Sequence, residues 1–416
     1  MKKVQTLLWL SVLFSCSSVW AHGKVGSVAK DGSLNGIINF PDVKGRLTLI
    51  SDLHTHSVFS DGHVWPNIRV AEATRNGLDV LAITEHLEYQ PHIAQVPHKD
   101  RNSAFLEANE AAKGSSLVVL AGSEITRDMP PGHINAVFIK DANKLFGIDL
   151  PKNDKEKEIL NKKIREMQWG AEPAIKEHYI LGNMWPAEKA VEAANQQGAF
   201  LFWNHPDWYR QAPDGIARLQ PMHRKMIDKG YLHGIEVVNG STYSEEAFRI
   251  AIENNLALIG TSDVHNLIEW DYLTRVGEHR PITLIFAKDR SKESIKEALF
   301  QRRTVIWFKE ILIGKEDNLL PLLESIISIE SVGYDKGTQI LNVIIKNNSS
   351  AKLQLKNQSR FTFLNNTNLI DLPGNDKIKL RIKTLKELDN LQLEFEVLNA
   401  LITPGKNPLV IVSTKI

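Results

Sequence analysis

The chain has 416 residues, 43% of them hydrophobic and 24% charged, which is ordinary for one large or two smaller globular domains. Its 50 basic and 49 acidic residues give a net charge of +1. This balance provides no broad basic surface for nucleic acid or for an anionic membrane, so we expect neither as a partner.

The first residues have the features of a targeting segment. Lys2 and Lys3 precede a short apolar run, and Val19 and Ala21 place small-to-medium side chains before a cleavage point after Ala21. We therefore expect residues 1–21 to be a signal peptide and the mature protein to be periplasmic or secreted. The run is shorter than the roughly 20 residues that span a bilayer, although an uncleaved anchor is an alternative. No other segment is apolar enough to cross a membrane.

The single cysteine, Cys16, lies inside this segment. Residues 13–16 loosely resemble a bacterial lipoprotein cleavage site, except that Phe14 is bulky where a small residue is usual. Secretion without a lipid is the preferred interpretation, and lipid attachment at Cys16 is the alternative. Cleavage after Ala21 would leave a mature protein without thiols, which suits an oxidising compartment.

Short apolar runs then alternate with amphipathic stretches. The runs predict buried strands at residues 47–50, 80–83, 117–120, 136–139, 201–203, 235–238, 256–259 and 283–286. Helical patterns lie between several of them, at residues 67–75, 103–113, 187–197, 244–254 and 291–302. This alternation predicts parallel βαβ units, and about eight strands favour an irregular α/β barrel over an open sheet.

Two later regions depart from this alternation. Residues 141–185 are charged, and we expect them to form an excursion over the mouth of the barrel. From about Ser325 the sequence alternates apolar and polar residues, with Asn, Gly and Pro between the runs. Strands are predicted at residues 341–345, 361–363, 378–382 and 391–395. This pattern is typical of a small antiparallel, Ig-like β-sandwich.

The clearest chemical signal is a pair of histidines directly after the first predicted strand. His54 and His56 are two residues apart on extended backbone, so their side chains point to the same side and can reach one metal ion. Asp61 follows shortly afterwards in a Ser-Asp-Gly sequence. Two imidazoles buried side by side without a metal or an acid would be costly.

Further groups of potential ligands follow the later strands. They are Thr84-Glu85-His86, Ser123-Glu124, Gly132-His133, Asn204-His205 and Ser262-Asp263-Val264-His265. Each lies at a strand terminus, and all but Gly132-His133 lie just past the C-terminal end of a run. Because that end of an α/β barrel carries the active site, the shared placement predicts one metal centre there.

These motifs resemble the PHP family (polymerase and histidinol phosphatase), metallohydrolases on a distorted seven-stranded α/β barrel. The resemblance covers roughly residues 44–303. Further segments are similar to the Sb-PDE family of phosphodiesterases, namely residues 59–66, 124–127, 129–133, 204–206 and 234–240. The resemblance implies an α/β fold with a distorted (β/α)7 PHP domain over residues 22–318 and a β-sandwich domain over residues 325–416.

The resemblance also implies two to three divalent metal ions. His54, His56, Glu124 and Asp263 would hold one ion. Glu124 would bridge to a second, completed by His133 and His205, while Asp61, His86 and His265 would hold the third. These ligands suit Zn²⁺ or Mn²⁺, with Fe²⁺ as a further option. A hydroxide bridging two ions would attack phosphorus, so Glu124 and Asp263 would act in catalysis through the ions that hold it.

The activity implied is hydrolysis of small organic phosphodiesters. A phosphomonoesterase or a nuclease of the same fold is the alternative, and a noncatalytic binding module is a third interpretation. Arg127 is a candidate to bind a phosphate oxygen in catalysis, with a salt bridge at the rim as the alternative. Asn204 is a candidate substrate contact, although a turn cap is preferred. Glu85 is expected to orient a ligand, with direct binding of a metal ion as the alternative.

Three aromatic residues near the same motifs are candidates for the wall of a pocket that would hold an organic leaving group. They are Trp203, Trp208 and Tyr209. Core packing is the preferred interpretation for all three, because large aromatic side chains contribute mainly to cores.

Overall fold

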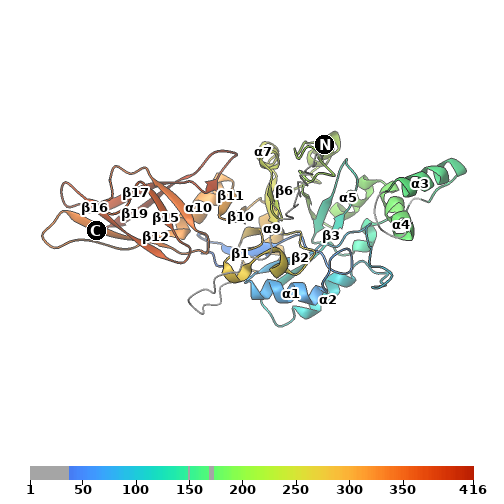
Figure 1. The fold of residues 1–416 in the computed structure, drawn as a ribbon, viewed down its shortest axis with the longest axis horizontal. Coiled ribbons are helices and arrows are strands. Elements are labelled where there is room, and N and C mark those ends of the chain that lie inside the picture. Colours follow the sequence, from blue (N-terminus) through green and yellow to red (C-terminus); the bar gives the residue numbers. More distant parts are fainter. Residues whose placement is uncertain (1–36, 149, 168–172) are drawn as a thin grey trace, which may run out of the picture.

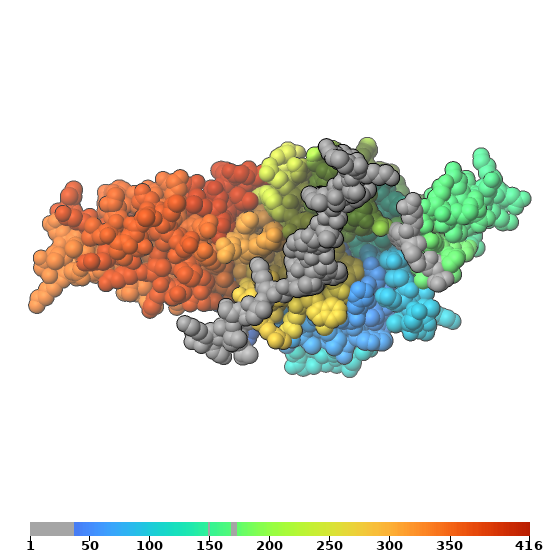
Figure 2. Space-filling model, in the orientation of Figure 1, coloured from blue at the N-terminus to red at the C-terminus, as the bar shows by residue number. Residues whose placement is uncertain are grey.

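The computed structural model describes residues 37–148, 150–167 and 173–416. The predicted signal peptide, with Cys16, lies outside the described residues. The molecule is elongated, with the α/β part in the middle, a β-sandwich at one end and the helices α3 (Asp154–Glu166) and α4 (Pro173–Met184) at the other (Figures 1 and 2). Within these described ranges, no helix is both long and apolar enough to cross a membrane.

A curled sheet forms the body of the α/β part. Its main strands run in the order β9 (Ile282–Ala287), β1 (Leu47–Asp52), β2 (Val80–Ile83), β3 (Val118–Ile125), β4 (Ile134–Val137), β5 (Phe200–Trp203), β6 (Gly234–Asn239) and β8 (Ala257–Thr261). The backbone amide and carbonyl of Gly260 on β8 both bond the Thr283 hydroxyl on β9. These bonds bring the two ends of the strand order together, although β8 and β9 are not paired as neighbouring strands. The sheet is therefore curled into a half-barrel, which confirms the predicted distorted barrel.

The predicted parallel βαβ arrangement fails at two places in this strand order. Strand β4 runs antiparallel to both β3 and β5, and β9 runs antiparallel to β1. Between β3 and β4 the chain contains no helix and includes Pro130-Pro131-Gly132, so it turns back instead of crossing over. The start of β4 therefore lies at the same edge of the sheet as the ends of β3 and β5.

All five predicted helices are present, and two of them begin at a capping serine. The five are α1 (Pro66–Arg75), α2 (Ser103–Ala111), α5 (Ala187–Gln196), α7 (Glu245–Glu253) and α9 (Lys292–Phe300). The Ser244 hydroxyl accepts the Ala247 amide at 3.1 Å at the start of α7, and Ser291 accepts the Ser294 amide at 3.1 Å at the start of α9. Helix α6 (Pro221–Asp228) was not predicted.

The charged excursion folds as helices. A short 3-10 turn, η1 (Ala142–Leu145), leads into α3 and α4, whose inner faces form a small apolar cluster with Leu160, Tyr179 and Leu181. The pair projects from the side of the half-barrel (Figure 1). Met167 and Tyr179 line the cavity beside the metal-ligand candidates, so the excursion reaches the mouth as predicted.

Two antiparallel sheets form the C-terminal sandwich, as predicted. One contains β12 (Ile327–Tyr334), β13 (Ile340–Asn347) and β16 (Lys377–Lys383), and the other contains β15 (Leu369–Leu372), β14 (Leu353–Asn357), β17 (Asn390–Val397) and β19 (Leu409–Lys415). The strand predicted at residues 361–363 is wrong, since only Phe363 forms a bridge. Side-chain amides of Asn357 and Asn365 bond backbone carbonyls there and replace a ladder.

The sandwich and the half-barrel share one apolar core. The two-residue strand β18 (Ala400–Leu401) pairs in parallel with β11 (Ile311–Gly314) at the edge of the half-barrel sheet, beyond β10 (Thr304–Phe308). Helix α10 (Glu316–Ile326) joins the two parts, and its Leu319 and Leu323 belong to a cluster that also contains sandwich residues. The two parts are therefore packed together and not merely tethered.

Candidate metal centre

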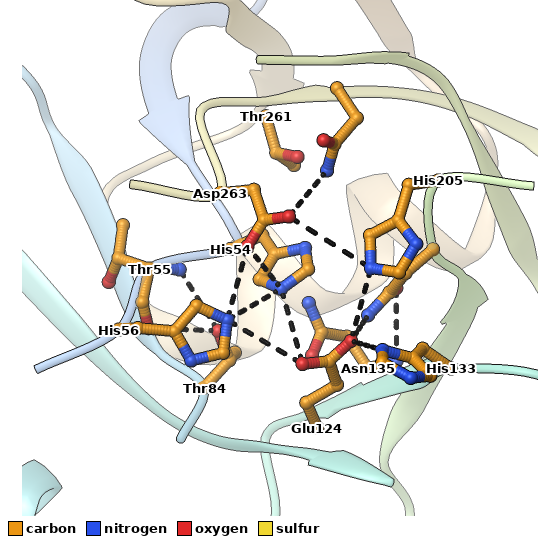
Figure 3. Close-up of polar contacts among 12 residues, drawn as sticks. His54, Thr55, His56, Thr84, Glu124, His133, Asn135, His205, Thr261 and Asp263 are labelled. Atoms are coloured by element: carbon orange, nitrogen blue, oxygen red, sulfur yellow. Dashed lines mark hydrogen bonds and ion pairs between the residues drawn. The ribbon is translucent and has the colours of Figure 1, made fainter. Parts of the chain in front are cut away.

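Nine potential ligands from distant parts of the chain meet at one edge of the half-barrel. They are His54, His56, Asp61, His86, Glu124, His133, His205, Asp263 and His265. Figure 3 shows six of them pointing toward a common centre. His133 was the one candidate predicted to precede its strand, and the reversed direction of β4 brings it to the edge where the other candidates follow theirs.

Three overlapping groups have ligand atoms close enough to hold a cation. They are His56, Asp61, His86 and His265; His54, His56 and Asp263; and His86, Glu124 and His133. The first group contains the three ligands of the third predicted site, together with His56. The second group contains three of the four ligands of the first predicted site, and His56 belongs to both groups. His205 is in none of these groups, but its Nε2 lies 3.4 Å from Glu124 Oε1 and 3.9 Å from Asp263 Oδ2. It therefore adjoins the site predicted for it.

The two carboxylate oxygens of Glu124 face different sets of imidazoles. Oε2 lies 3.7 Å from His54 Nε2, 3.5 Å from His56 Nε2 and 2.6 Å from His86 Nδ1. Oε1 lies 2.8 Å from His133 Nδ1 and 3.4 Å from His205 Nε2. This arrangement suits a carboxylate that bridges two cations, one on each oxygen.

The outward-facing nitrogens of three histidines are held by acceptors. His54 Nδ1 lies 2.8 Å from Glu236 Oε1, His56 Nδ1 lies 3.2 Å from Ser60 Oγ, and His265 Nδ1 lies 2.8 Å from the Asp263 carbonyl oxygen. With the ring proton on Nδ1, each Nε2 presents a lone pair to the centre. Such orientation by a second group is typical of histidines that bind metals.

Glu85 has the orienting position expected for it. Its carboxylate accepts the Ser57 amide at 3.1 Å and a short hydrogen bond from the Ser60 hydroxyl, which in turn contacts His56. Burial raises the pKa of Glu85, and these hydrogen bonds act in the opposite direction. Glycine is required nearby, because a Cβ at Gly62 would lie 2.8 Å from the Ser57 nitrogen.

Two buried arginines, not identified from the sequence, hold the ligand-bearing loops together. Arg69 on α1 donates to the carbonyl oxygens of His56 at 2.8 Å and Val264 at 3.2 Å, which lie in the two loops with paired ligands. Arg280 pairs with Asp52 at 3.2 Å, and Asp52 accepts the Ser262 hydroxyl at 2.6 Å. These contacts fix the end of β1 against the end of β8.

Two candidate ligands have unusual backbone conformations. His205 has φ of 28° and Asp263 has φ of 50°, in the region that non-glycine residues seldom occupy. The surrounding contacts hold them there, since the His205 amide donates to Glu236 Oε2 at 2.7 Å and the Asp263 amide donates to the His54 carbonyl at 3.0 Å. Strain of this kind is common at functional sites.

Opposite charges compensate one another inside the buried cluster. Burial would raise the pKa of Glu124, but His86 and neighbouring imidazoles hold it well below its usual value. Burial lowers the pKa of His265, but the contact with Asp61 and the negative charges of Asp61 and Asp263 together outweigh this effect and raise it to about 9. Burial together with His86 and His265 lowers the pKa of His56 to about 3. The cluster therefore contains ionised acids whose charge must be balanced by protons or by cations.

The donor set fits divalent cations. His54 Nε2 and His56 Nε2 lie 3.0 Å apart, and both lie close to Asp263 Oδ1, at 3.1 Å and 3.2 Å. Among the described residues, Asp61 Oδ1 and Glu124 Oε2 are buried acceptors without a well-directed hydrogen bond. Lone pairs and unsatisfied carboxylate oxygens that converge in this way are what a Zn²⁺ or Mn²⁺ ion would satisfy.

A cavity of about 800 Å³ opens beside the cluster. It is lined by Asp61, His86, Tyr89, Thr126, Arg127, Asp128, Met129, His133, Met167, Tyr179, Trp208, Arg210 and Gln211. The metal-ligand candidates thus form part of a space large enough for an organic molecule, in which catalytic and substrate groups can meet.

Arg127 lines this cavity but is also part of a buried ion pair. Its Nη1 lies 2.8 Å from Glu88 Oε1 and also donates to the Gly182 carbonyl. Its Nε and Nη2 have no hydrogen-bond partner among the residues that the structure describes. One edge of the guanidinium group is therefore engaged by the protein, while the other is unpaired but enclosed by protein atoms, so an anion would reach it only after the cavity wall shifts.

Asn204 is placed differently from the predicted substrate contact. Its side chain is fully buried, with Nδ2 donating to Glu124 Oε1 at 2.9 Å and Oδ1 accepting the Asn135 amide at 3.1 Å. Both ends of the amide are thus occupied by protein, which makes Asn204 a positioning residue for Glu124. Of the aromatic candidates, Trp203 is in the core as expected, Tyr209 is 62% exposed, and Trp208 lines the cavity.

Comparison with known proteins agrees with this architecture. Residues 52–264 match the PHP domain family and residues 327–413 match an Ig-like domain family. A crystal structure from Bacteroides vulgatus, of a two-domain protein containing a predicted PHP-like metal-dependent phosphoesterase, has 36% identity. The match covers 94% of this chain and all of that chain, with a TM-score of 0.75. No curated protein matches the chain.

Two other structures are less similar. An amidohydrolase from Chromobacterium violaceum has 20% identity over 52% of this chain and 87% of that chain, with a TM-score of 0.33. A lesion-specific endonuclease from Pyrococcus furiosus has 16% identity over 66% of this chain and 60% of that chain, with a TM-score of 0.34. The match of residues 52–264 and the similarity to the Bacteroides structure over its full length establish that this chain belongs to the PHP domain family.

Proposed function

We propose that this chain is a metal-dependent phosphodiesterase that acts on small organic phosphodiesters. The observation that carries the proposal is the convergence of nine His, Asp and Glu side chains at one side of a cavity of about 800 Å³. Two or three divalent ions would supply an activated water at neutral pH and neutralise the phosphoryl oxygens. The nine ligands would hold the ions, with Glu124 contacting two of them.

The protein's own side chains would do the remaining work. The free edge of Arg127 would bind an oxygen of the phosphodiester, while Glu88 holds the other edge in place. The cavity is large enough to hold an ester arm beside the phosphoryl group. The similarity of five sequence segments to the Sb-PDE family supports a diester over a monoester as substrate.

A panel of substrates tests this proposal. Purified protein loaded with Mn²⁺ or Zn²⁺ should hydrolyse bis(4-nitrophenyl) phosphate faster than 4-nitrophenyl phosphate or a single-stranded oligonucleotide. Elemental analysis should find about two to three divalent ions per chain, and a chelator should abolish turnover. A preference for the monoester or the oligonucleotide would overturn the proposed substrate class, and full activity in chelator would overturn the metal dependence.

We also propose that the protein is exported to the periplasm or secreted. The basic start, the short apolar run and the residues before Ala21 support cleavage after that residue. The intact mass of protein from the extracytoplasmic fraction should correspond to a chain that begins at His22. A mass corresponding to a lipid-modified chain that begins at Cys16 would instead support the lipoprotein alternative.

A further inference from the structure

We propose that the cavity beside the metal centre binds a planar aromatic ring carried by one ester arm of the substrate. This inference rests on the proposed phosphodiesterase function and deepens it by naming the substrate class. It starts from the position of two half-buried aromatic side chains, Tyr89 and Trp208, both of which line the cavity.

Tyr89 and Trp208 each pack against metal-ligand candidates. The Tyr89 ring centroid lies 6.0 Å from that of His86, with an angle of 61° between the planes. The Trp208 ring lies 5.4 Å from His133 at 61° and 5.2 Å from His205 at 74°. A group attached to a phosphoryl centre at these imidazoles is thus within reach of both aromatic side chains.

Further side chains add apolar and planar surface beside this pair, among polar lining residues such as Thr126 and Asp128. Tyr179 lies edge-on to Tyr89, with ring centroids 6.2 Å apart at 86°, and extends that wall. Met129 and Met167 also line the cavity, and their flexible thioethers adapt well to aromatic rings. The Arg210 guanidinium lies 5.4 Å from the Trp208 ring centroid, which adds a planar cationic surface at the same wall.

Other tryptophans of the chain show what a purely structural role looks like. Trp203 is fully buried, stacks on His223 at 3.9 Å and donates from Nε1 to Gln211 Oε1 at 2.9 Å. Trp270 is 70% exposed and does not line the cavity. Trp208 differs from both, because it is packed on the site yet leaves part of its surface to the cavity.

Direct binding measurements separate this inference from the phosphodiesterase proposal, because they need no turnover. Calorimetric titration of the Mn²⁺-loaded full chain should use methyl-, cyclohexyl- and phenylphosphonate, at a pH where all three carry the same charge. Phenylphosphonate should bind about three- to tenfold more tightly than cyclohexylphosphonate, the range expected for aromatic pairing beyond apolar burial. A comparison of the affinities of adenosine 5′-monophosphate and ribose 5-phosphate tests whether the bound ring can be a nucleobase.

Substitutions locate the effect. Trp208→Leu and Tyr89→Leu should each bring the phenyl-to-cyclohexyl affinity ratio toward one while leaving methylphosphonate binding unchanged. Trp270→Leu, a matched change on the surface, should preserve the ratio. Equal affinity for the phenyl and cyclohexyl compounds in the unaltered protein, or a ratio that survives both cavity substitutions, would overturn the inference. If the ratio behaves as expected but no phosphodiester is hydrolysed, the ring site stands and the proposed reaction fails.

Discussion

The Oε1 atom of Glu236 lies 2.8 Å from Nδ1 of His54, and both side chains are fully excluded from solvent. Three further donors surround the same carboxylate: the Thr261 hydroxyl at 2.6 Å, the His205 amide at 2.7 Å and the Asn239 amide group at 2.9 Å. The arrangement uses both carboxylate oxygens of Glu236 as acceptors. It fixes the proton of His54 on Nδ1 and turns Nε2 toward the centre.

Replacing Glu236 with glutamine should therefore weaken metal binding without removing a ligand. The glutamine retains one acceptor oxygen but places an NH₂ group against a donor, so the His54 ring loses its fixed orientation. Loss of a partner of this kind typically costs about 10- to 100-fold in metal affinity. Competition with a coloured chelator measures the affinity. Glu253→Gln, an exposed change at the end of α7, should have no effect, and unchanged affinity in Glu236→Gln would refute the orienting role.

The nine candidate ligands could be identified from the sequence because all of them except Asp61 lie in or close to a strand whose apolar pattern is visible there. The residues that hold the ligand-bearing loops in place could not be predicted, because Arg69 and Arg280 act across long sequence separations that no local pattern encodes. Glu236 left one signal, since it interrupts an otherwise apolar run and a charge buried in a strand needs partners. The antiparallel course of β4 was missed because apolar runs specify strands but not their direction.

Glu124→Gln should reduce turnover by at least about a hundredfold, the cost of a misplacement near 1 Å at a reacting centre. The glutamine has about the same size, but it removes the negative charge between two sets of imidazoles and can offer an acceptor to only one of them. Elemental analysis should show loss of metal while circular dichroism shows an intact fold. Near-normal activity with full metal content would mean that Glu124 is not the bridging ligand.

Arg127 needs a more careful substitution than alanine. Arg127→Ala would leave Glu88 buried without its partner, and breaking such a pair typically costs about 3–5 kcal/mol of stability. Arg127→Lys keeps the charge near Glu88 but removes the free edge of the guanidinium group. We expect it to raise KM for a phosphodiester while the metal content stays unchanged. If KM is unaffected in a stable Arg127→Lys protein, Arg127 serves only the ion pair.

The metal-free protein should be most stable near pH 6.5. His265 has a folded-state pKa of about 9 against a usual value of 6.5, so its stabilising effect is complete below pH 6.5 and is lost as pH rises through 9. His56 has a folded-state pKa of about 3, so the unfolded state takes up its proton first and stability falls as pH drops from 6.5 toward 3.

Thermal melts of chelator-treated protein between about pH 5 and pH 9 test this expectation. Added Mn²⁺ should raise Tm most at the alkaline end, where protons no longer balance the carboxylates and the metal takes their place. A Tm of the metal-free protein that rises steadily to pH 9 would contradict the assignment of His265.

The shared core predicts that half-barrel and sandwich unfold together, and it changes an expectation from the sequence alone. All nine candidate ligands precede Gly314, so the sequence alone predicts that a chain ending near that residue keeps its metals and activity. The structure shows that this cut would remove α10 and β18 and would expose apolar surface on β11 and its neighbours. Loss of solubility would then report on packing and not on catalysis.

A point substitution in α10 tests the coupling without removing the sandwich. Leu323 is fully buried in the shared core, so Leu323→Ala should cost about 2–5 kcal/mol and lower Tm. Calorimetry should show a single transition in both proteins, with metal content and turnover retained below Tm, because no residue lining the cavity comes from the sandwich. Leu385→Ala, on a side chain that is 95% exposed, is the matched control. Two separate transitions would show that the sandwich folds independently, whereas loss of turnover at full metal content would show that this packing shapes the site.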